Sequence, residues 1–132
     1  MEDSGEPLIV PSRPIGSLVS RQMIDIAPGS TLRQVVAKLV DNDVGVIVVH
    51  DGTDAKGILS ERDILDWVHD RVDLDTVSVD EVMQPDIISV DPEMSATDAG
   101  RVMIDRGVRH LMVNGPDGGV VSIRAVLRSM LS

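Results

Sequence analysis

The chain has 132 residues, 42% of them hydrophobic, which suffices for one compact domain or for two half-domains that share a core. It contains one Trp, no Phe, no Tyr and no Cys, so its core is aliphatic, and disulfides and thiolate metal sites are excluded. A net charge of -10 repels phosphate backbones and argues against a nucleic-acid-binding role.

Membrane and export signals are weak in this sequence. The longest apolar run, Val46 to Val49, is far shorter than a membrane span. The acidic N-terminus lacks the basic and apolar regions of a signal peptide. We therefore expect a cytoplasmic protein that does not bind membranes.

In chain order, residues 1–12 combine acids, Gly and two prolines, and we expect them to form a flexible arm. From Ile15 the chain repeats itself with a shift of 64 residues. After a hairpin loop that is two residues shorter in the second copy, the shift becomes 62, and GILSERDI from Gly57 aligns with GVVSIRAV from Gly119. The predicted boundaries are 13–72 for the first repeat, 73–78 for a linker and 79–132 for the second repeat.

Both repeats predict the same elements. A short strand ends at Pro28 or Pro92, and an amphipathic helix follows a capping signal at Thr31 or Ser95. Next come a buried strand, a Gly/Asp-rich turn, a second strand and a closing helix. We predict an α/β (α+β) fold of two tandem β-α-β-β-α repeats packed with pseudo-twofold symmetry, because a repeat of roughly 55 residues is too small to bury its own faces.

Three features carry a resemblance to a known family. They are the repeat itself, the aliphatic-aliphatic-Ser-x-x-Asp phrase at Ser60 to Asp63, and the strand GVRHLMV over residues 107–113. On these features, residues 15 to about 131 resemble a CBS-domain pair, or Bateman module, of the stand-alone bacterial type. Met112 departs from the family pattern, which has Pro at this position.

The resemblance implies a regulatory or sensing module without catalysis. Such pairs commonly hold an adenosine-containing ligand in a cleft between the repeats, and two pairs commonly associate. For this chain it implies AMP, ADP or ATP as a ligand, no required cofactor, a homodimer, and a separate effector protein that reads the ligand state.

Ser60 and Asp63 are the first candidate ligand residues. The resemblance implies that Asp63 accepts the ribose hydroxyls and that Ser60 lies near the phosphate. Two charge-assisted hydrogen bonds, each of about 1.5–3 kcal/mol, would select a ribose over water. The residues also allow a structural alternative, in which Ser60 and Asp63 are the N-cap and N3 residues of a helix. Both roles can coexist, because a helix start attracts anions.

Arg62, Arg109 and Arg124 are the candidate phosphate contacts, since a nucleotide entering an acidic protein needs local positive charge. The resemblance implies that Arg109 and Arg124 face the cleft that contains Asp63. For Arg62 a solvated surface position is the alternative.

Four aliphatic side chains would line an adenine slot, with ordinary core packing as the alternative for each: Ile58, Ile87, Ile88 and Met112. No nucleophile or metal-ligand cluster accompanies the three histidines, which are His50, His69 and His110. The sequence therefore offers no case for an enzyme.

The second copy of the motif departs from the first. Ala125 stands where the first repeat has Asp63, and Gly45 stands where the second repeat has Arg109. A cleft built on Ala125 would lose several kcal/mol, or at least about a hundredfold in affinity. We therefore predict one competent nucleotide site and one degenerate site. The alternative function is that of a structural dimerisation module that binds no nucleotide.

Overall fold

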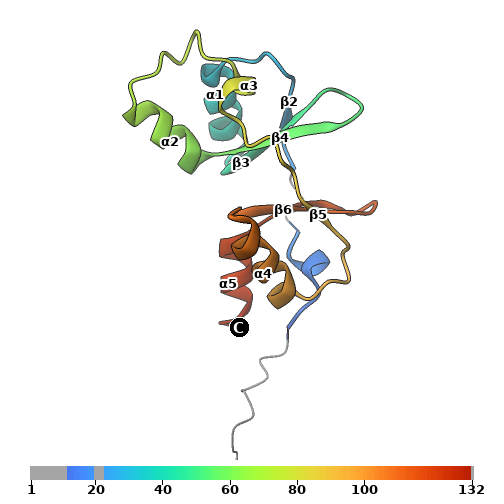
Figure 1. Cartoon of the computed structure of the whole chain (residues 1–132). Helices are drawn as coiled ribbons and strands as arrows, with labels where there is room; N and C mark the ends of the chain where they lie inside the picture. Colours follow the sequence, from blue (N-terminus) through green and yellow to red (C-terminus); the bar gives the residue numbers. More distant parts are fainter. Residues whose placement is uncertain (1–11, 20–22, 132) are drawn as a thin grey trace, which may run out of the picture. The chain divides into compact units, whose positions relative to one another are not determined.

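The computed structural model describes residues 12–19 and 23–131, so the predicted arm lies outside the described residues except for Ser12. Within this part the chain forms two compact units (Figure 1). The first unit lies within residues 21–88, and the second joins residues 12–19 to residues 89–131. Each is a mixed α/β unit with one three-stranded sheet, and the predicted fold class is confirmed.

The first unit follows the predicted order of elements. Strand β2 (Asp25–Ile26) pairs in parallel with β3 (Val46–His50), and β3 pairs antiparallel with β4 (Ala55–Ser60). Helix α1 (Leu32–Asn42) connects β2 to β3, and α2 (Glu61–His69) follows β4 directly. A short helix, α3 (Val79–Val82), completes the unit.

The second unit has the same order at the predicted shifts. Strand β5 (Ser89–Val90) pairs in parallel with β6 (His110–Val113), and β6 pairs antiparallel with β7 (Gly119–Ser122). Helix α4 (Ala96–Arg106) connects β5 to β6, and α5 (Ile123–Ser129) follows β7. A 3₁₀ helix, η1 (Ile15–Leu18), belongs to this unit.

One face of each sheet packs against helices. In the first unit, sheet residues Ile47, Val49 and Leu59 join a buried cluster with Leu32, Val35, Leu39, Ile64, Val79 and Val82 of the three helices. Side chains alternate between the two faces of a strand, so Val48 and Ile58 point to the opposite face. Burial of each large aliphatic side chain contributes about 1.5–3 kcal/mol, which makes these clusters the main source of stability.

The short helix of each unit comes from the segment that precedes the other unit's repeat in the sequence. Helix η1 precedes the first repeat but belongs to the second unit, and α3 precedes the second repeat but belongs to the first unit. Ile15 of η1 and Val79 of α3 are both fully buried and stand 64 residues apart. Equivalent backbone bonds hold both segments: Leu32 N–H to Val77 O (3.1 Å) and Val79 N–H to Ser30 O (2.7 Å), and Ala96 N–H to Arg13 O (2.7 Å) and Ile15 N–H to Met94 O (2.7 Å). The internal repeat thus extends to these leading segments.

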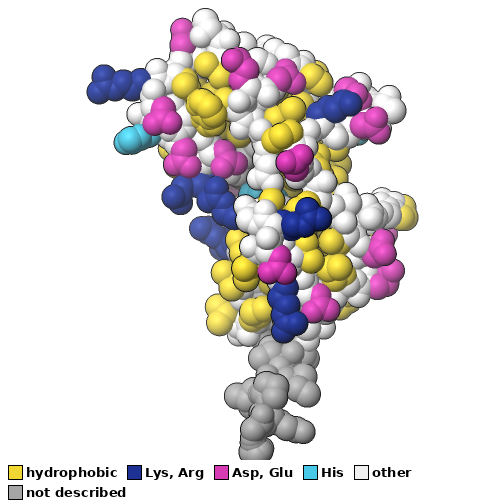
Figure 2. All heavy atoms as spheres, in the orientation of Figure 1, with side chains coloured by type: hydrophobic (Ala, Val, Ile, Leu, Met, Phe, Trp, Pro, Cys, Tyr) yellow, Lys and Arg dark blue, Asp and Glu magenta, His cyan; other side chains and the backbone are white. Residues whose placement is uncertain are grey.

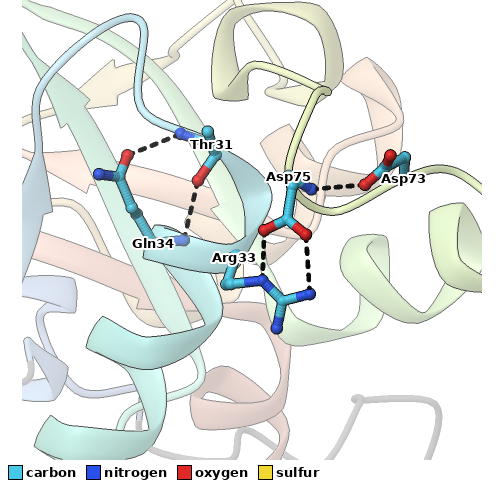
Figure 3. Close-up of polar contacts among 5 residues, drawn as sticks. All are labelled: Thr31, Arg33, Gln34, Asp73 and Asp75. Carbon is cyan, nitrogen blue, oxygen red and sulfur yellow. Dashed lines mark hydrogen bonds and ion pairs between the residues drawn. The ribbon is translucent and has the colours of Figure 1, made fainter.

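The N-terminus of α1 is fully capped. Thr31 and Gln34 form the predicted capping box, with the Gln34 N–H donating to Thr31 Oγ1 at 3.2 Å (Figure 3). The Arg33 guanidinium pairs with both carboxylate oxygens of Asp75, and Asp73 accepts the Asp75 N–H at 2.8 Å. Hydrogen bonding from Arg33 lowers the pKa of Asp75 and raises that of Arg33. The loop before α3 is thereby fixed against α1.

Two glycines offer a matched test of packing. A Cβ on Gly57 would lie 2.5 Å from Met83 Sδ and 2.9 Å from Gln84 O, which is backbone. A Cβ on Gly45 would lie 2.9 Å from Glu61 Oε1, the end of an exposed side chain that can rotate away. We expect Gly57→Ala to lower the free energy of unfolding by about 1–3 kcal/mol and Gly45→Ala by less. Urea unfolding of both variants measures this, and equal losses would contradict it.

The turn between β3 and β4 predicts a pH dependence. Backbone N–H groups of Asp54 (2.7 Å) and Thr53 (2.8 Å) donate to Asp51 and lower the pKa of its carboxyl to about 2. Because this pKa lies below the usual value of about 3.9, the stabilisation is present above pH 4 and is lost as the pH falls toward 2. Asp51→Ala should flatten the pH dependence of the unfolding free energy in this range. An unchanged slope would show that these bonds do not stabilise the turn.

Candidate functional site

The candidate site centres on the junction between β4 and α2. Ser60 ends the strand, is 5% exposed and forms the N-cap of the helix. Its Oγ accepts the Asp63 N–H at 3.2 Å and donates to Asp63 Oδ2 at 2.9 Å. The Ser60 N–H donates to the same carboxylate oxygen at 3.3 Å. The structural role of these two residues is thus confirmed, and the ribose-binding role of Asp63 stays a prediction.

At the equivalent junction in the second unit, between β7 and α5, the backbone of Arg109 lies close to the helix turn that carries Arg124. The Ile123 N–H at the start of α5 donates to the Arg109 carbonyl at 2.8 Å, as the Glu61 N–H donates to the Gly45 carbonyl at 2.9 Å. Arg109 therefore lies beside the first turn of α5, which carries Arg124, and both residues are exposed. The junction gathers positive charge at the start of a helix.

The two junctions differ in their caps. Ser122 Oγ accepts the Ala125 N–H at 3.1 Å, which keeps the serine cap of the first repeat. Ala125 has no carboxylate to bond back to Ser122, so the reciprocal half of the capping box is present only at Asp63. The backbone of the motif is conserved between the repeats, whereas the acid is not.

The aliphatic candidates occupy two kinds of position. Ile58 is 6% exposed, and it exchanges two backbone hydrogen bonds with Gln84, at 3.0 and 2.8 Å. This bridge brings the segment that carries the half-buried Ile87 and Ile88 toward β4. Met112, on β6, is half-buried and alternates with the fully buried Leu111. Ile58 and Met112 thus lie on the sheet faces opposite the helix-packed residues.

Arg62 is exposed, and its Nε lies 3.8 Å from Asp66 Oδ1 one turn along α2. This position matches the surface alternative that the sequence allowed. An exposed i,i+4 pair of this kind contributes little to stability, so the guanidinium can leave Asp66 at low cost. Its role as a phosphate contact remains a prediction.

The histidines show no catalytic arrangement in the described chain. His50 Nδ1 accepts the Gly52 N–H at 3.0 Å and stabilises the β3–β4 turn, and His69 Nδ1 lies 3.4 Å from Asp70 Oδ1. His110 is half-buried at the start of β6. Among residues 12–19 and 23–131, no group of three or more His, Asp or Glu side chains could hold a metal ion. In the same part of the chain, no helix combines the length and apolar character needed to cross a membrane.

Residues of the candidate site therefore fall into two sets. The first unit holds Ser60, Arg62, Asp63, Ile58, Ile87 and Ile88, and the second holds Arg109, Arg124 and Met112. Within the first set the geometry brings Ile58, Ser60 and Asp63 to one strand end.

Glu61 is a residue that sequence reasoning missed. Its carboxylate lies where a side chain at position 45 would begin, because Gly45 lacks a Cβ. Gly45 aligns with Arg109, so a carboxylate in the first unit lies beside the position from which the arginine side chain starts in the second unit. The signal in the sequence is that the acidic Glu61 aligns with the apolar Ile123.

Two curated relatives match most of the chain. It is 30% identical over 121 residues to an uncharacterized 17.7 kDa protein of Acidianus ambivalens, covering 89% of this chain and 73% of the relative. It is 27% identical over 119 residues to uncharacterized protein MK0525 of Methanopyrus kandleri, covering 86% of this chain. The chain spans 61% of the length of that second relative.

Solved structures match both repeats. CBS domain protein PAE2072 from Pyrobaculum aerophilum, complexed with AMP, superposes with a TM-score of 0.72 at 27% identity, covering 90% of this chain and 98% of that protein. The CBS domain of a bacterial CNNM/CorC family Mg²⁺ transporter, in complex with ATP, has a TM-score of 0.72 at 20% identity, covering 89% and 87%. The second likeness shows the fold alone.

The CBS domain family matches residues 15–70 and again residues 79–132. These two segments account for most of the chain and coincide with the internal repeat. The resemblance predicted from the sequence is confirmed, and the chain belongs to the CBS domain family as a tandem pair.

Proposed function

We propose that the chain is a regulatory module that binds one adenine nucleotide, of the AMP, ADP or ATP class, between its two repeats. The half-buried carboxylate of Asp63, fixed by the Ser60 cap at the end of β4, is the observation that supports this most. A fixed acceptor loses little conformational entropy on binding, which favours recognition of a ribose. The AMP complex of the Pyrobaculum relative, at 27% identity, adds support.

Charge also favours a ligand shared between the repeats. Residues 21–88 contain fourteen acidic and six basic residues, so the unit that holds Asp63 repels a phosphate. Residues 89–132 contain five basic and five acidic residues, so their charges balance. Arg109 and Arg124, at the start of α5, are the proposed source of positive charge for the phosphate.

The second site is proposed to be degenerate. Ala125 supplies no acceptor for ribose hydroxyls, and Gly45 supplies no guanidinium. The Glu61 carboxylate beside Gly45 adds a negative charge that disfavours a phosphate. One nucleotide per chain is therefore the expected stoichiometry.

Regulation, rather than catalysis, is the proposed role, and we place it in the cytoplasm. The ligand would favour one arrangement of the repeats, which a homodimer partner or a separate effector protein would read. The exposed apolar side chains of α2, of α5 and of the two residues after α5 would supply the surface for such association: Leu65, Val68, Leu127, Met130 and Leu131.

A structural dimerisation module is the second candidate. The Ser60–Asp63 capping box and the buried Ile58 favour it, because both stabilise the fold without a ligand. Thermal shifts with AMP, ADP, ATP, NADH and S-adenosylmethionine separate the two proposals. A ligand at a hundred times its Kd adds about 2.7 kcal/mol of stability, whereas no shift with any of them would leave the structural role.

Asp63→Asn is the sharpest test of the ribose contact. The amide oxygen can still accept from Ser60, so the cap and the fold are expected to survive, whereas the charge is lost. We expect AMP affinity, measured by calorimetry, to fall by about tenfold to a hundredfold, which is about 1.4–2.8 kcal/mol. Asp63→Ala should lower both affinity and stability.

Glu81→Gln is the matched control. Glu81 is the exposed N3 acid of the α3 capping box, where its Oε2 accepts the Ser78 N–H at 2.9 Å. The variant makes the same change from acid to amide in the same unit and should bind AMP as the unaltered protein does. Equal AMP affinity in the unaltered protein and in the Asp63 and Glu81 variants would show that Asp63 does not contact the ligand.

The phosphate contacts have a separate test. Arg109→Gln and Arg124→Gln should each weaken AMP binding by about tenfold, because a charged hydrogen bond is lost, and should leave adenosine binding nearly unchanged. Arg106→Gln, an exposed arginine in the last turn of α4, is the control. Calorimetry with both ligands measures the difference, and an equal loss for adenosine would argue against a phosphate role.

A further inference from the structure

The turn between β6 and β7 holds an accessible Asn-Gly dipeptide. Asn114 is exposed, and Gly115 has a φ of +102°, a conformation that favours glycine. Among the described residues, a Cβ built on Gly115 would have one neighbour within 4 Å, Pro92 Cγ at 4.0 Å. The turn extends beyond its sheet in Figure 1 and stands out from the surface in the space-filling view (Figure 2). The main-chain amide of Gly115 is therefore open to solvent and to the neighbouring side chain.

The two groups that can react at this dipeptide are not hydrogen bonded within the described chain. The Gly115 N–H has no acceptor there, and the Asn114 side-chain amide has no partner. The backbone around them is anchored, because the Asn114 N–H donates to Val90 O at 2.9 Å and the Gly118 N–H donates to Gly115 O at 3.0 Å. The turn thus keeps Asn114 Cγ and the Gly115 nitrogen close in sequence and unprotected.

The other asparagine of the chain, Asn42, is protected. Its Nδ2 donates to Lys38 O at 2.8 Å at the end of α1. The amide that follows it, the Asp43 N–H, donates to Val40 O at 3.2 Å. Attack at Asn42 therefore requires both bonds to break, which means local unfolding of the helix end.

The Asp-Gly dipeptide of the β3–β4 turn is protected in the same way. The Gly52 N–H donates to His50 Nδ1 at 3.0 Å, and Asp51 Oδ1 accepts the N–H groups of Thr53 and Asp54. These bonds lower the pKa of the Asp51 carboxyl to about 2, so the group is an ionised carboxylate near neutral pH and a poor electrophile. The two hairpins of the repeat thus differ in chemical reactivity.

We propose that Asn114 is a site of spontaneous covalent modification, at which attack by the Gly115 nitrogen converts asparagine into aspartate and isoaspartate. Asparagine is among the thermolabile residues of proteins. The Gly115 nitrogen loses its proton to hydroxide and bonds to Asn114 Cγ. The Cγ–Nδ2 bond then breaks, and the leaving nitrogen takes a proton from water and departs as ammonia, which leaves a cyclic succinimide.

Water then opens the succinimide at one of two bonds. Cleavage between Cγ and the Gly115 nitrogen gives aspartate, whereas cleavage between the Asn114 main-chain carbon and that nitrogen gives isoaspartate. Water is consumed and ammonia is released, with no oxidant, metal or enzyme. Nothing in this reaction depends on the proposed nucleotide site.

The products alter a tight turn. Isoaspartate carries the main chain through Cβ and so lengthens the backbone path from β6 to β7. Space for this is limited, because a Cβ on Gly118 would lie 2.1 Å from Val113 O and 2.9 Å from Gly115 O. Both products also add a negative charge near the exposed Asp117. We expect the modification to weaken the β6–β7 hairpin, which carries Met112.

Incubation of the whole protein at neutral pH tests the site. Trypsin releases Asn114 in the peptide 110–124 and Asn42 in the peptide 39–56, so one short digest and mass spectrometry follow both residues. Protein unfolded in guanidinium gives the intrinsic rates. Folded Asn114 should convert within about tenfold of its unfolded rate, and folded Asn42 at least about a hundredfold below its own. Protection of Asn114 as strong as that of Asn42 would overturn the proposal.

Asp51→Asn provides a matched Asn-Gly dipeptide in the protected hairpin. The new amide oxygen can still accept from Thr53 and Asp54, and the Gly52 N–H can still donate to His50. We expect position 51 to convert at least about tenfold more slowly than Asn114 in the same molecule, because bonded groups must first be released. Adding His50→Val should speed conversion at position 51 by about twofold to tenfold. Equal rates at both hairpins would show that these bonds do not select the site and would overturn the proposal.

Asn114→Gln is the control for the structural effect. Its longer side chain must close a six-membered ring, so the peptide 110–124 should keep its mass during incubation. Urea unfolding should show a lower midpoint for incubated than for fresh unaltered protein and no change for the incubated variant. An equal loss of stability in the variant would place the damage elsewhere in the chain and overturn the assigned effect on the hairpin.

Discussion

The serine cap at the strand-to-helix junction is the interaction on which both repeats depend. At Ser60 and again at Ser122, one hydroxyl accepts the N3 amide of the following helix and so fixes the direction in which that helix leaves the sheet. A second backbone bond, from the first helical amide to Gly45 or Arg109, ties the same junction to the neighbouring strand. Each side chain near the helix start is therefore held on a rigid backbone.

Because these backbone bonds carry the geometry, the side chains around them can differ between the two repeats. Ala125 stands at the position equivalent to Asp63, and Gly45 at the position equivalent to Arg109, while the serine cap and the strand bond are present in both units. The same holds on the helix surface, where Asp66 and Arg128 have opposite charges at equivalent positions. The repeated fold thus contains two strand-to-helix junctions with different side chains, followed by two helices of different charge, α2 and α5.

The parts of the structure that depend on local pattern were predictable from the sequence. The hydrophobic periodicity and the Thr31–Gln34 capping box predicted the elements, because each depends on residues only a few positions apart. The register of the repeat then predicted that the same order of elements occurs twice. The placement of η1 and α3 was not predictable in this way, since a repeat pattern does not say which copy a leading segment packs on. The contact between Glu61 and Gly45 was also missed, because it depends on the path of β3 beside the start of α2.

In the proposed site, the distribution of charge links binding to regulation. Residues 21–88 include Asp63, the proposed ribose acceptor, but carry an excess of eight negative charges, so this unit alone is a poor place for a phosphate. The two arginines proposed to contact the phosphate, Arg109 and Arg124, belong to the other unit. A nucleotide whose sugar is recognised by one repeat and whose phosphate is recognised by the other binds tightly only when both repeats adopt one mutual arrangement. Its binding free energy then stabilises that arrangement over others, which is the requirement for a ligand to act as a signal.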